Sequence, residues 1–238
     1  MIPNLTDHCS SNNNMRTIYL SRHGESLNNL FGKIGGDAEL SPRGWLYAKA
    51  LCGFFQSSRP VSKIWTSELK RTQQTTEYLE EGKKTVESGI NEINAGEHDS
   101  MTYEEIAESF PKEFAMRDRD KLRYRYPDGE SYMDVVGRLE PVMKMILQED
   151  NLLVISHQAT LRCVLALLLG TSLEELPYMR VPLHTVIELR LDNGEVEMIN
   201  HKLNVDCVDT HRAMPDNCEI NRNPFEACIT VPGHLTEI

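Results

Sequence analysis

Short apolar runs alternate along this chain with longer amphipathic stretches. Runs rich in β-branched residues and bounded by polar segments are typical of strands. They predict strands over residues 16–21, 61–66 and 152–156. Two further runs, 184–191 and 195–201, flank Asp192-Asn-Gly194. Because Asn-Gly favours a tight two-residue turn, this pair predicts a β-hairpin.

Capping signals predict the helices that separate these strands. Ser41 and Pro42 supply an N-cap and a proline at the first helical position, and another helix is expected after Ser67. A capping box in residues 102–105 opens one further helix. Residues 131–134 open a longer helix that reaches about residue 148. A last helix is predicted over residues 158–169.

The alternation of strands and helices predicts an α/β fold, a three-layer α/β/α arrangement around a mostly parallel central sheet. Residues 1–15 are polar and predict a flexible N-terminal arm. Residues 16–238 are expected to form a single domain. Its C-terminal tail, from about residue 204, carries Pro215, Pro224 and Pro232 and is expected to be extended.

Composition narrows the class of protein. The hydrophobic fraction of 40% and the charged fraction of 26% are ordinary for a globular protein, and we expect a cytoplasmic location because no secretory signal or membrane span is evident. The six cysteines lack metal-ligand spacing, which favours reduced thiols over a zinc site. A net charge of −11 argues against binding nucleic acid or an anionic membrane. If this acidic protein binds an anion, its positively charged side chains must be concentrated at the binding site.

The strand over residues 16–21 leads directly into Arg22, His23 and Gly24. Open α/β sheets place ligand sites at the carboxyl ends of their strands. The guanidinium of Arg22 suits a phosphoryl group, and a neutral histidine beside it is a candidate nucleophile. Gly24 is expected to let backbone amides approach an oxyanion. Taken alone, an Arg-His-Gly tripeptide is more often a solvated surface loop, and the rest of the chain has to overturn that interpretation.

Several other polar residues are also candidates for binding an anion or for catalysis. His157 ends the strand over residues 152–156, and Arg71 falls in the first turn of a predicted helix, where a cation suits the helix dipole only if it faces an anion. Glu92 lies in an Asn/Gly-rich loop. Arg117 and Lys121 have i, i+4 spacing and would share a face of a helix. The alternative for these two residues is a solvated, salt-bridged helix.

Together these segments resemble the histidine phosphatase (phosphoglycerate mutase-like) superfamily, and within it the bisphosphatase domain of 6-phosphofructo-2-kinase/fructose-2,6-bisphosphatase. The resemblance rests on R-H-G-E-S at residues 22–26, T-S-x-x-x-R-T at 66–72, S-H-Q at 156–158, Y-R-Y-P-D-G-E-S-Y at 124–132 and T-H-R at 210–212. It runs from about Arg16 to Gly233.

The resemblance implies a phosphoglycerate mutase-like fold and hydrolysis of the 2-phosphate of fructose 2,6-bisphosphate through a phosphohistidine. This reaction yields fructose 6-phosphate and phosphate and controls glycolysis and gluconeogenesis. The implied catalytic residues are His23, Glu92 and His157. The implied 2-phosphate ligands are Arg22, Asn29, Arg71 and His157, and the 6-phosphate and sugar ligands are Ile34, Gly35, Tyr103, Arg117, Lys121, Tyr132, Gln158 and Arg162. Neither a metal nor another cofactor is implied.

Three alternatives remain open at this point: a phosphoglycerate mutase, a broad-specificity phosphomonoesterase, and a non-catalytic sugar-phosphate sensor. Mutases of the superfamily usually carry Trp-Asn after R-H-G-E-S, where this chain has Leu27-Asn-Asn29. The chain contains no G-x-x-x-x-G-K-[ST] motif, so no ATP site or kinase activity is expected. The partner is expected to be a small sugar bisphosphate, with no nucleic acid or membrane, and the oligomeric state stays undetermined.

The remaining histidines and Cys163 are expected to have no role in catalysis. His98 and His201 lie in polar sequence contexts without a partner pattern. His184 begins a predicted strand and is expected to be structural. Cys163 lies on an apolar helix, where a thiol usually packs.

Overall fold

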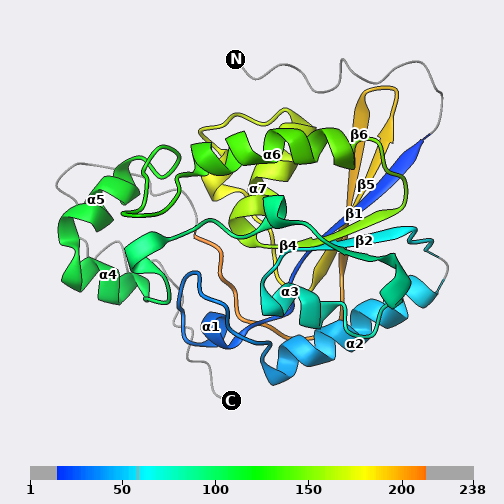
Figure 1. The fold of residues 1–238 in the computed structure, drawn as a ribbon, viewed down its shortest axis with the longest axis horizontal. Coiled ribbons are helices and arrows are strands. Elements are labelled where there is room, and N and C mark those ends of the chain that lie inside the picture. Colours follow the sequence, from blue (N-terminus) through cyan, green and yellow to red (C-terminus); the bar gives the residue numbers. More distant parts are fainter. Residues whose placement is uncertain (1–14, 58, 213–238) are drawn as a thin grey trace.

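The computed structural model describes residues 15–57 and 59–212 (Figure 1). Within these residues six strands form one sheet in the order β3-β2-β4-β1-β5-β6. Their bounds are β1 Arg16–Arg22, β2 Lys63–Thr66, β3 Lys84–Val86, β4 Leu152–Ser156, β5 Thr185–Asp192 and β6 Glu195–Lys202. The pairs β3–β2, β2–β4 and β4–β1 are parallel, whereas β5 runs antiparallel to both β1 and β6. The predicted mostly parallel sheet is therefore confirmed.

Helices cover both faces of the sheet. They are α1 Leu27–Leu30, α2 Pro42–Gln56, α3 Lys70–Thr75, α4 Tyr103–Ser109, α5 Pro111–Arg119, α6 Tyr132–Ile146 and α7 Gln158–Leu169. Short 3-10 turns span Glu81–Lys83, Ser88–Ile90, Gly96–His98 and Leu176–Tyr178. In Figure 1, α6 and α7 lie on one side of the sheet and α2 and α3 on the other, while α4 and α5 project beyond its edge.

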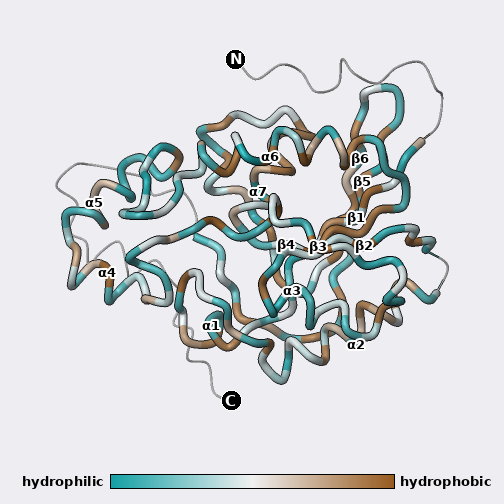
Figure 2. The backbone as a smooth tube through the Cα atoms, in the orientation of Figure 1, coloured by the Kyte–Doolittle hydropathy of each residue, from teal (hydrophilic) through white to brown (hydrophobic). Residues whose placement is uncertain are grey.

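Alternating side chains on the buried strands supply both core layers. Ile18 and Leu20 of β1 pack with the apolar faces of α6 and α7, whereas Tyr19 between them packs with Tyr47 and Leu51 of α2. This is the two-residue period of a strand covered on both faces. Hydrophobic residues accordingly concentrate on the central strands in Figure 2.

The local capping signals are mostly confirmed. Thr102 and Glu105 form the predicted capping box at α4, and α6 begins after Ser131 as predicted, with a capping box between Ser131 and Asp134. The helix after Ser67 differs from the expectation, because α3 begins only at Lys70 and has no side-chain cap. The hydroxyl of Ser67 is instead within 2.7 Å of His157 Nε2.

The predicted hairpin is present between β5 and β6. Asn193 and Gly194 have φ values of 49° and 85°. Positive φ at both central residues is the requirement of a type I′ turn, which matches the twist of the strands it joins. The sequence signal and the backbone therefore agree at this turn.

The segment that follows β6 lies close to the first strand. Residues 203–212 form neither helix nor strand, and the Val208 N–H donates to Glu25 Oε2 at 2.9 Å. Residues 1–14 of the predicted arm over residues 1–15 lie outside the described residues, and so do residues 213–238 of the predicted tail. Among the described helices, none has the length and apolar character needed to span a bilayer.

Candidate active site

Two histidines meet at the carboxyl edge of the sheet. His23 follows β1 and His157 follows β4, and these neighbouring strands pair Arg22 with Ser156. The His23 N–H donates to the Ser156 carbonyl at 3.0 Å. The two ring centroids consequently lie 5.2 Å apart. The parallel register therefore brings together two residues that are far apart in the sequence.

The environment of His23 favours a nucleophilic imidazole. Its Nδ1 lies 2.8 Å from the Gly24 carbonyl oxygen, which can only accept a hydrogen bond. The proton is therefore on Nδ1, and Nε2 keeps its lone pair. Burial, followed by the charges of Arg71 and Arg22, holds the pKa of His23 well below its ordinary value. The ring is thus neutral at pH 7, as an attacking nitrogen must be.

Gly24 lies where two backbones pack closely. A Cβ at this position would lie 2.7 Å from the Gly44 carbonyl oxygen in α2. The Gly24 N–H donates to Thr75 Oγ1 at 2.8 Å, so it is already used within the protein. Gly24 therefore permits the close approach of α2, and its own N–H is not available to an oxyanion.

Arg22 is buried and held mainly through one nitrogen. Its NH1 donates to Gln158 Oε1, the Val181 carbonyl and Thr210 Oγ1 at 2.8, 3.0 and 2.7 Å. Its Nε has no hydrogen-bond partner among the described residues. Burial lowers the pKa of Arg22 to about 10, so the side chain remains charged at neutral pH. The anchored NH1 leaves Nε in position to meet an anion.

Arg71 supplies a second buried cation. It lies in the first turn of α3, as predicted, and its NH1 donates to the Gly36 carbonyl at 2.5 Å. Burial lowers its pKa, which the charges of Glu92 and Asp37 partly offset. Two guanidinium groups, Arg22 from β1 and Arg71 from α3, thus line the same cavity as His23.

Glu92 lies at the N-terminus of α7. Its Oε1 accepts from the Ile93 and Ala159 N–H groups at 3.0 and 3.2 Å. Ala159 belongs to the first turn of α7, where backbone amides have no partner within the helix and can hold the carboxyl group in place. Its backbone contacts hold the carboxyl group of Glu92 in the cavity that His23 also lines.

A second group of cations lines the same cavity. Arg117 donates through Nε to Tyr126 Oη at 2.7 Å and through NH2 to Tyr103 Oη at 3.0 Å. Arg162 donates to Tyr132 Oη at 2.9 Å, and its NH2 has no partner within residues 15–57 and 59–212. Tyrosine hydroxyls therefore orient these guanidinium groups without neutralising them.

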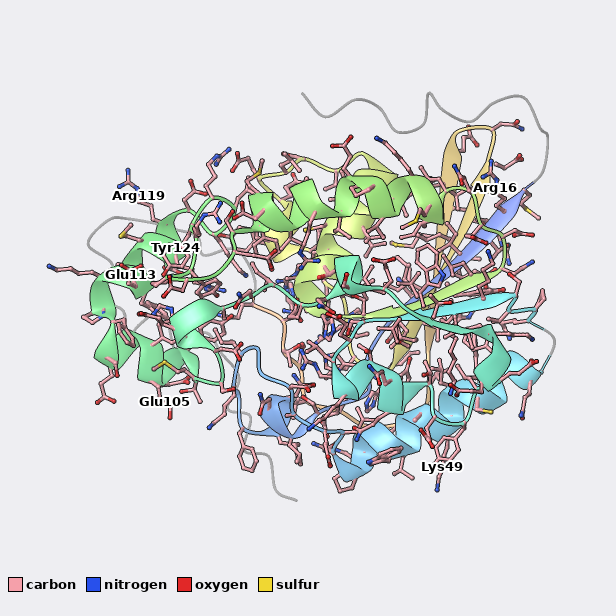
Figure 3. The ribbon with its side chains drawn as sticks, viewed as in Figure 1. Arg16, Lys49, Glu105, Glu113, Arg119 and Tyr124 are labelled. Carbon is pink, nitrogen blue, oxygen red and sulfur yellow. The ribbon has the colours of Figure 1, made fainter. Side chains whose placement is uncertain are left out.

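Lys121 also belongs to this group, but it lies on a different structural element from the one that the sequence predicted. Because α5 ends at Arg119, Lys121 lies beyond the helix, and the expectation of a shared helical face with Arg117 was wrong. Its Nζ donates to the Pro177 carbonyl at 3.0 Å. Burial, with the charges of Arg162 and Arg117, holds the pKa of Lys121 well below its usual range. Arg119 instead points outward in Figure 3, away from Tyr124 and Glu113.

One cavity is lined by all the predicted site residues except His157. His157 is buried beside it, with Nε2 near Ser67 Oγ. Sequence reasoning missed several lining residues: Ser26, Asn28, Tyr124, Tyr126, Thr210 and Arg212. Thr210 and Arg212 lie in a T-H-R segment that contributed to the family resemblance, but no strand or helix pattern placed that segment near the site.

Three other histidines have defined structural surroundings. His98 is buried against Phe110 and Tyr126, although its neighbours in the sequence are polar. His201 was expected to lack a partner, but its Nε2 lies 2.8 Å from Glu188 Oε2. His184 stacks on Tyr47 at 4.6 Å between ring centroids and accepts from the Glu25 N–H. None of these three residues lines the cavity.

Cys163 is fully buried, and burial raises its pKa, as expected of a thiol that packs in the core. Within the described residues no group of three or more His, Cys, Asp or Glu side chains is arranged to hold a metal ion. The polar groups of the cavity are instead mainly cationic, with Glu92 as the carboxylate on its wall.

The fold and the site define a class of enzyme: α/β proteins that transfer a phosphoryl group through a buried neutral histidine flanked by arginines. The chain belongs to the histidine phosphatase superfamily (branch 1), whose family profile matches residues 18–204. Solved structures with this fold include an α-ribazole-5′-P phosphatase, described as putative, from Escherichia coli. Its TM-score is 0.73 and its identity 20%, over 82% of this chain and all of that chain. YhfR of Bacillus stearothermophilus gives a TM-score of 0.66 at 24% identity, over 80% of this chain and 96% of that chain.

Closer relatives share more of the sequence. The chain is 54% identical to 6-phosphofructo-2-kinase/fructose-2,6-bisphosphatase of Gallus gallus, over 92% of this chain and 47% of the relative. It is 52% identical to 6-phosphofructo-2-kinase/fructose-2,6-bisphosphatase 1 of Homo sapiens, over 92% of this chain and 46% of the relative. The chain thus spans about half the length of these relatives, and its family identifies that half with the phosphatase.

Proposed function

We propose that this chain hydrolyses the 2-phosphate of fructose 2,6-bisphosphate, and so takes part in the control of glycolysis and gluconeogenesis. The observation that carries this proposal is the second cationic group, Arg117, Lys121 and Arg162, in the cavity that holds His23. A monoester needs one such group, whereas a sugar bisphosphate needs two. The identity to fructose-2,6-bisphosphatases supports the same substrate.

In the first proposed step, His23 Nε2 attacks the 2-phosphoryl phosphorus. A P–N bond forms, the bond from phosphorus to the C2 oxygen breaks, and Glu92 in its protonated form gives its proton to that oxygen. Fructose 6-phosphate then leaves. Arg22, Arg71, Asn29 and His157 are proposed to bind the transferring group, so that fixed donors offset its charge in the transition state.

In the second proposed step, water attacks the phosphohistidine. Glu92, now ionised, accepts a proton from the water as the P–O bond forms and the P–N bond breaks. Phosphate leaves, and both His23 and Glu92 return to their starting states. One carboxyl group thus acts as acid and then as base, and its contact with the α7 amides keeps it within the site throughout.

The second cationic group is proposed to fix the substrate for this attack. Arg117, Lys121 and Arg162 would hold the 6-phosphate, and the sugar would lie against Ile34, Gly35, Tyr103, Tyr132 and Gln158, all of which line the cavity. Binding energy gained at the remote phosphate can then orient C2 for reaction.

A substrate panel tests the proposal: fructose 2,6-bisphosphate, 3-phosphoglycerate with 2,3-bisphosphoglycerate, and a generic phosphomonoester. We expect hydrolysis of the sugar bisphosphate to dominate. Lys121→Ala should raise its KM about 10- to 100-fold, the effect of losing one charge-assisted hydrogen bond. Lys144→Ala is the matched control, since Lys144 is an exposed α6 lysine paired with Glu140.

The outcomes separate the alternatives. Net isomerisation of 3-phosphoglycerate would identify a mutase. Equal turnover of the generic ester, with an unchanged KM in Lys121→Ala, would identify a broad-specificity phosphomonoesterase. Binding of the sugar bisphosphate without turnover would identify a sensor.

A further inference from the structure

The loop that carries Glu92 is held by side chains rather than by a neighbouring strand. After the 3-10 turn Ser88–Ile90 the backbone crosses to the cavity without a sheet partner. Buried carbonyls in such a segment need other donors. The Ile90 carbonyl accepts from Ser156 Oγ at 2.7 Å, and the Asn91 carbonyl accepts from Thr160 Oγ1 at 2.6 Å.

Arg138 of α6 supplies most of the remaining donors. Its NH1 donates to the Gly89 carbonyl at 2.6 Å, and its NH2 donates to the Asn91 and Glu92 carbonyls at 2.7 and 3.2 Å. One guanidinium therefore spans the loop and ends on the backbone of Glu92 itself. This fork geometry requires an arginine, because a lysine ammonium cannot reach several carbonyls in one plane.

Glu130 completes the arrangement from the opposite side. Its Oε1 accepts from Arg138 Nε at 2.8 Å, and its Oε2 accepts from the Asn94 N–H at 2.9 Å. The Glu130 N–H also donates to the Asn94 carbonyl at 2.9 Å. Glu130 thus orients the guanidinium and fixes the far end of the same loop. Both side chains are about one-quarter exposed, so solvent screens the pair only partly.

We propose that Arg138 and Glu130 form a clamp that positions Glu92 for proton transfer. The inference rests on the proposed role of Glu92 as general acid and base. Arg138 does not line the cavity that holds His23, so it acts through the Glu92 backbone and is a positioning residue. The clamp also gives a role to the G-E-S segment at residues 129–131, which the proposed chemistry does not use directly.

A double-mutant cycle tests the clamp with fructose 2,6-bisphosphate as substrate. Arg138→Met should lower kcat about 10- to 100-fold and leave KM within about threefold, because small displacements of a catalytic group cost rate more than binding. Arg138→Lys should recover only part of the loss. In a Glu92→Gln background, Arg138→Met should cause almost no further loss, since the group that it positions is already absent. Arg190→Met is the matched control, because Arg190 is paired with Glu188 on β5.

Each outcome has a distinct meaning. If Arg138→Met lowers kcat by the same factor with and without Glu92, the side chain acts only on the structure and the clamp is refuted. An unchanged kcat in Arg138→Met refutes it too. If Glu92→Gln alone retains full activity, the proposed role of Glu92 fails, whatever Arg138 does. Thermal unfolding of each variant shows whether a loss of rate follows from a loss of folded protein.

Discussion

At the scale of single residues, His23 combines a fixed tautomer with a depressed basicity. The Gly24 carbonyl holds the proton on Nδ1, and burial with Arg71 and Arg22 disfavours the imidazolium. A phosphohistidine enzyme needs both properties, because a protonated Nε2 cannot attack phosphorus. The same arginines that lower the pKa of His23 are proposed to bind the phosphate, so one charge arrangement serves two purposes.

The depressed pKa of His23 predicts a pH dependence of stability. The unfolded chain binds a proton below about pH 6.5, where the folded protein does not. The contribution of the neutral His23 to the free energy of unfolding is therefore fully present above that pH. It is lost as the pH decreases, by up to ~1.4 kcal/mol per pH unit for one histidine. In His23→Asn the free energy of unfolding should depend less steeply on pH between about pH 6.5 and 5. Its slope should be smaller by up to ~1.4 kcal/mol per pH unit, as measured by urea denaturation. The same slope in His23→Asn and the unmodified protein would contradict this assignment.

At the scale of elements, the site depends on how closely α2 approaches the loop after β1. Two glycines make the approach possible. A Cβ on Gly44 would lie 2.1 Å from the Glu25 carbonyl oxygen, and a Cβ on Gly24 would meet the Gly44 backbone. The loop that carries His23 and the first turn of α2 are therefore in contact through their backbones.

Two alanine substitutions on α2 should have opposite effects. Gly44→Ala should destabilise the protein by roughly 1–3 kcal/mol and reduce activity, because the backbone contact cannot relax cheaply. Gly53→Ala on the same helix meets nothing within 4 Å, so it should stabilise the protein by up to about 1 kcal/mol through helix propensity. Chemical denaturation of both variants checks this. Equal effects would show that the close approach is unimportant.

The elements also show what sequence can predict and what it cannot. The bounds of β4 and α7 follow from local signals, an apolar run and a helical period, and both agree with the structure. The β3 strand was missed because it has only three residues and lies at the sheet edge, where tertiary pairing decides. Lys121 was placed on a helix because residue spacing cannot reveal that α5 ends at Arg119. Its place on the cavity wall depends on a loop.

At the scale of the whole molecule, the segment after β6 contacts residues from two distant parts of the chain. Thr210 Oγ1 lies 2.7 Å from Arg22 NH1 and donates to Gln158 Oε1 at 2.9 Å. Three regions of the sequence thus meet at one guanidinium. No local pattern in residues 203–212 predicts this contact, which explains why Thr210 was missed. The net charge of −11 contrasts with this concentration of buried cations.

Removing the hydroxyl of Thr210 tests the importance of this contact. Thr210→Val keeps the shape of the side chain but leaves Arg22 with one fewer anchor. We expect kcat/KM for the sugar bisphosphate to fall about tenfold, the cost of one hydrogen bond to a charged group. Thr210→Ser retains the hydroxyl and should remain close to the unmodified protein. Steady-state kinetics of both variants decides, and an unaltered kcat/KM in Thr210→Val would refute the anchoring role.

The central claim is that His23 carries the phosphoryl group during turnover. Rapid acid-free quenching with fructose 2,6-bisphosphate labelled at the 2-phosphate measures this directly. We predict a transient, acid-labile phosphoenzyme whose label maps to His23, together with its complete absence in His23→Ala. Turnover of the substrate without any labelled protein, or a label that persists in His23→Ala, would contradict the account.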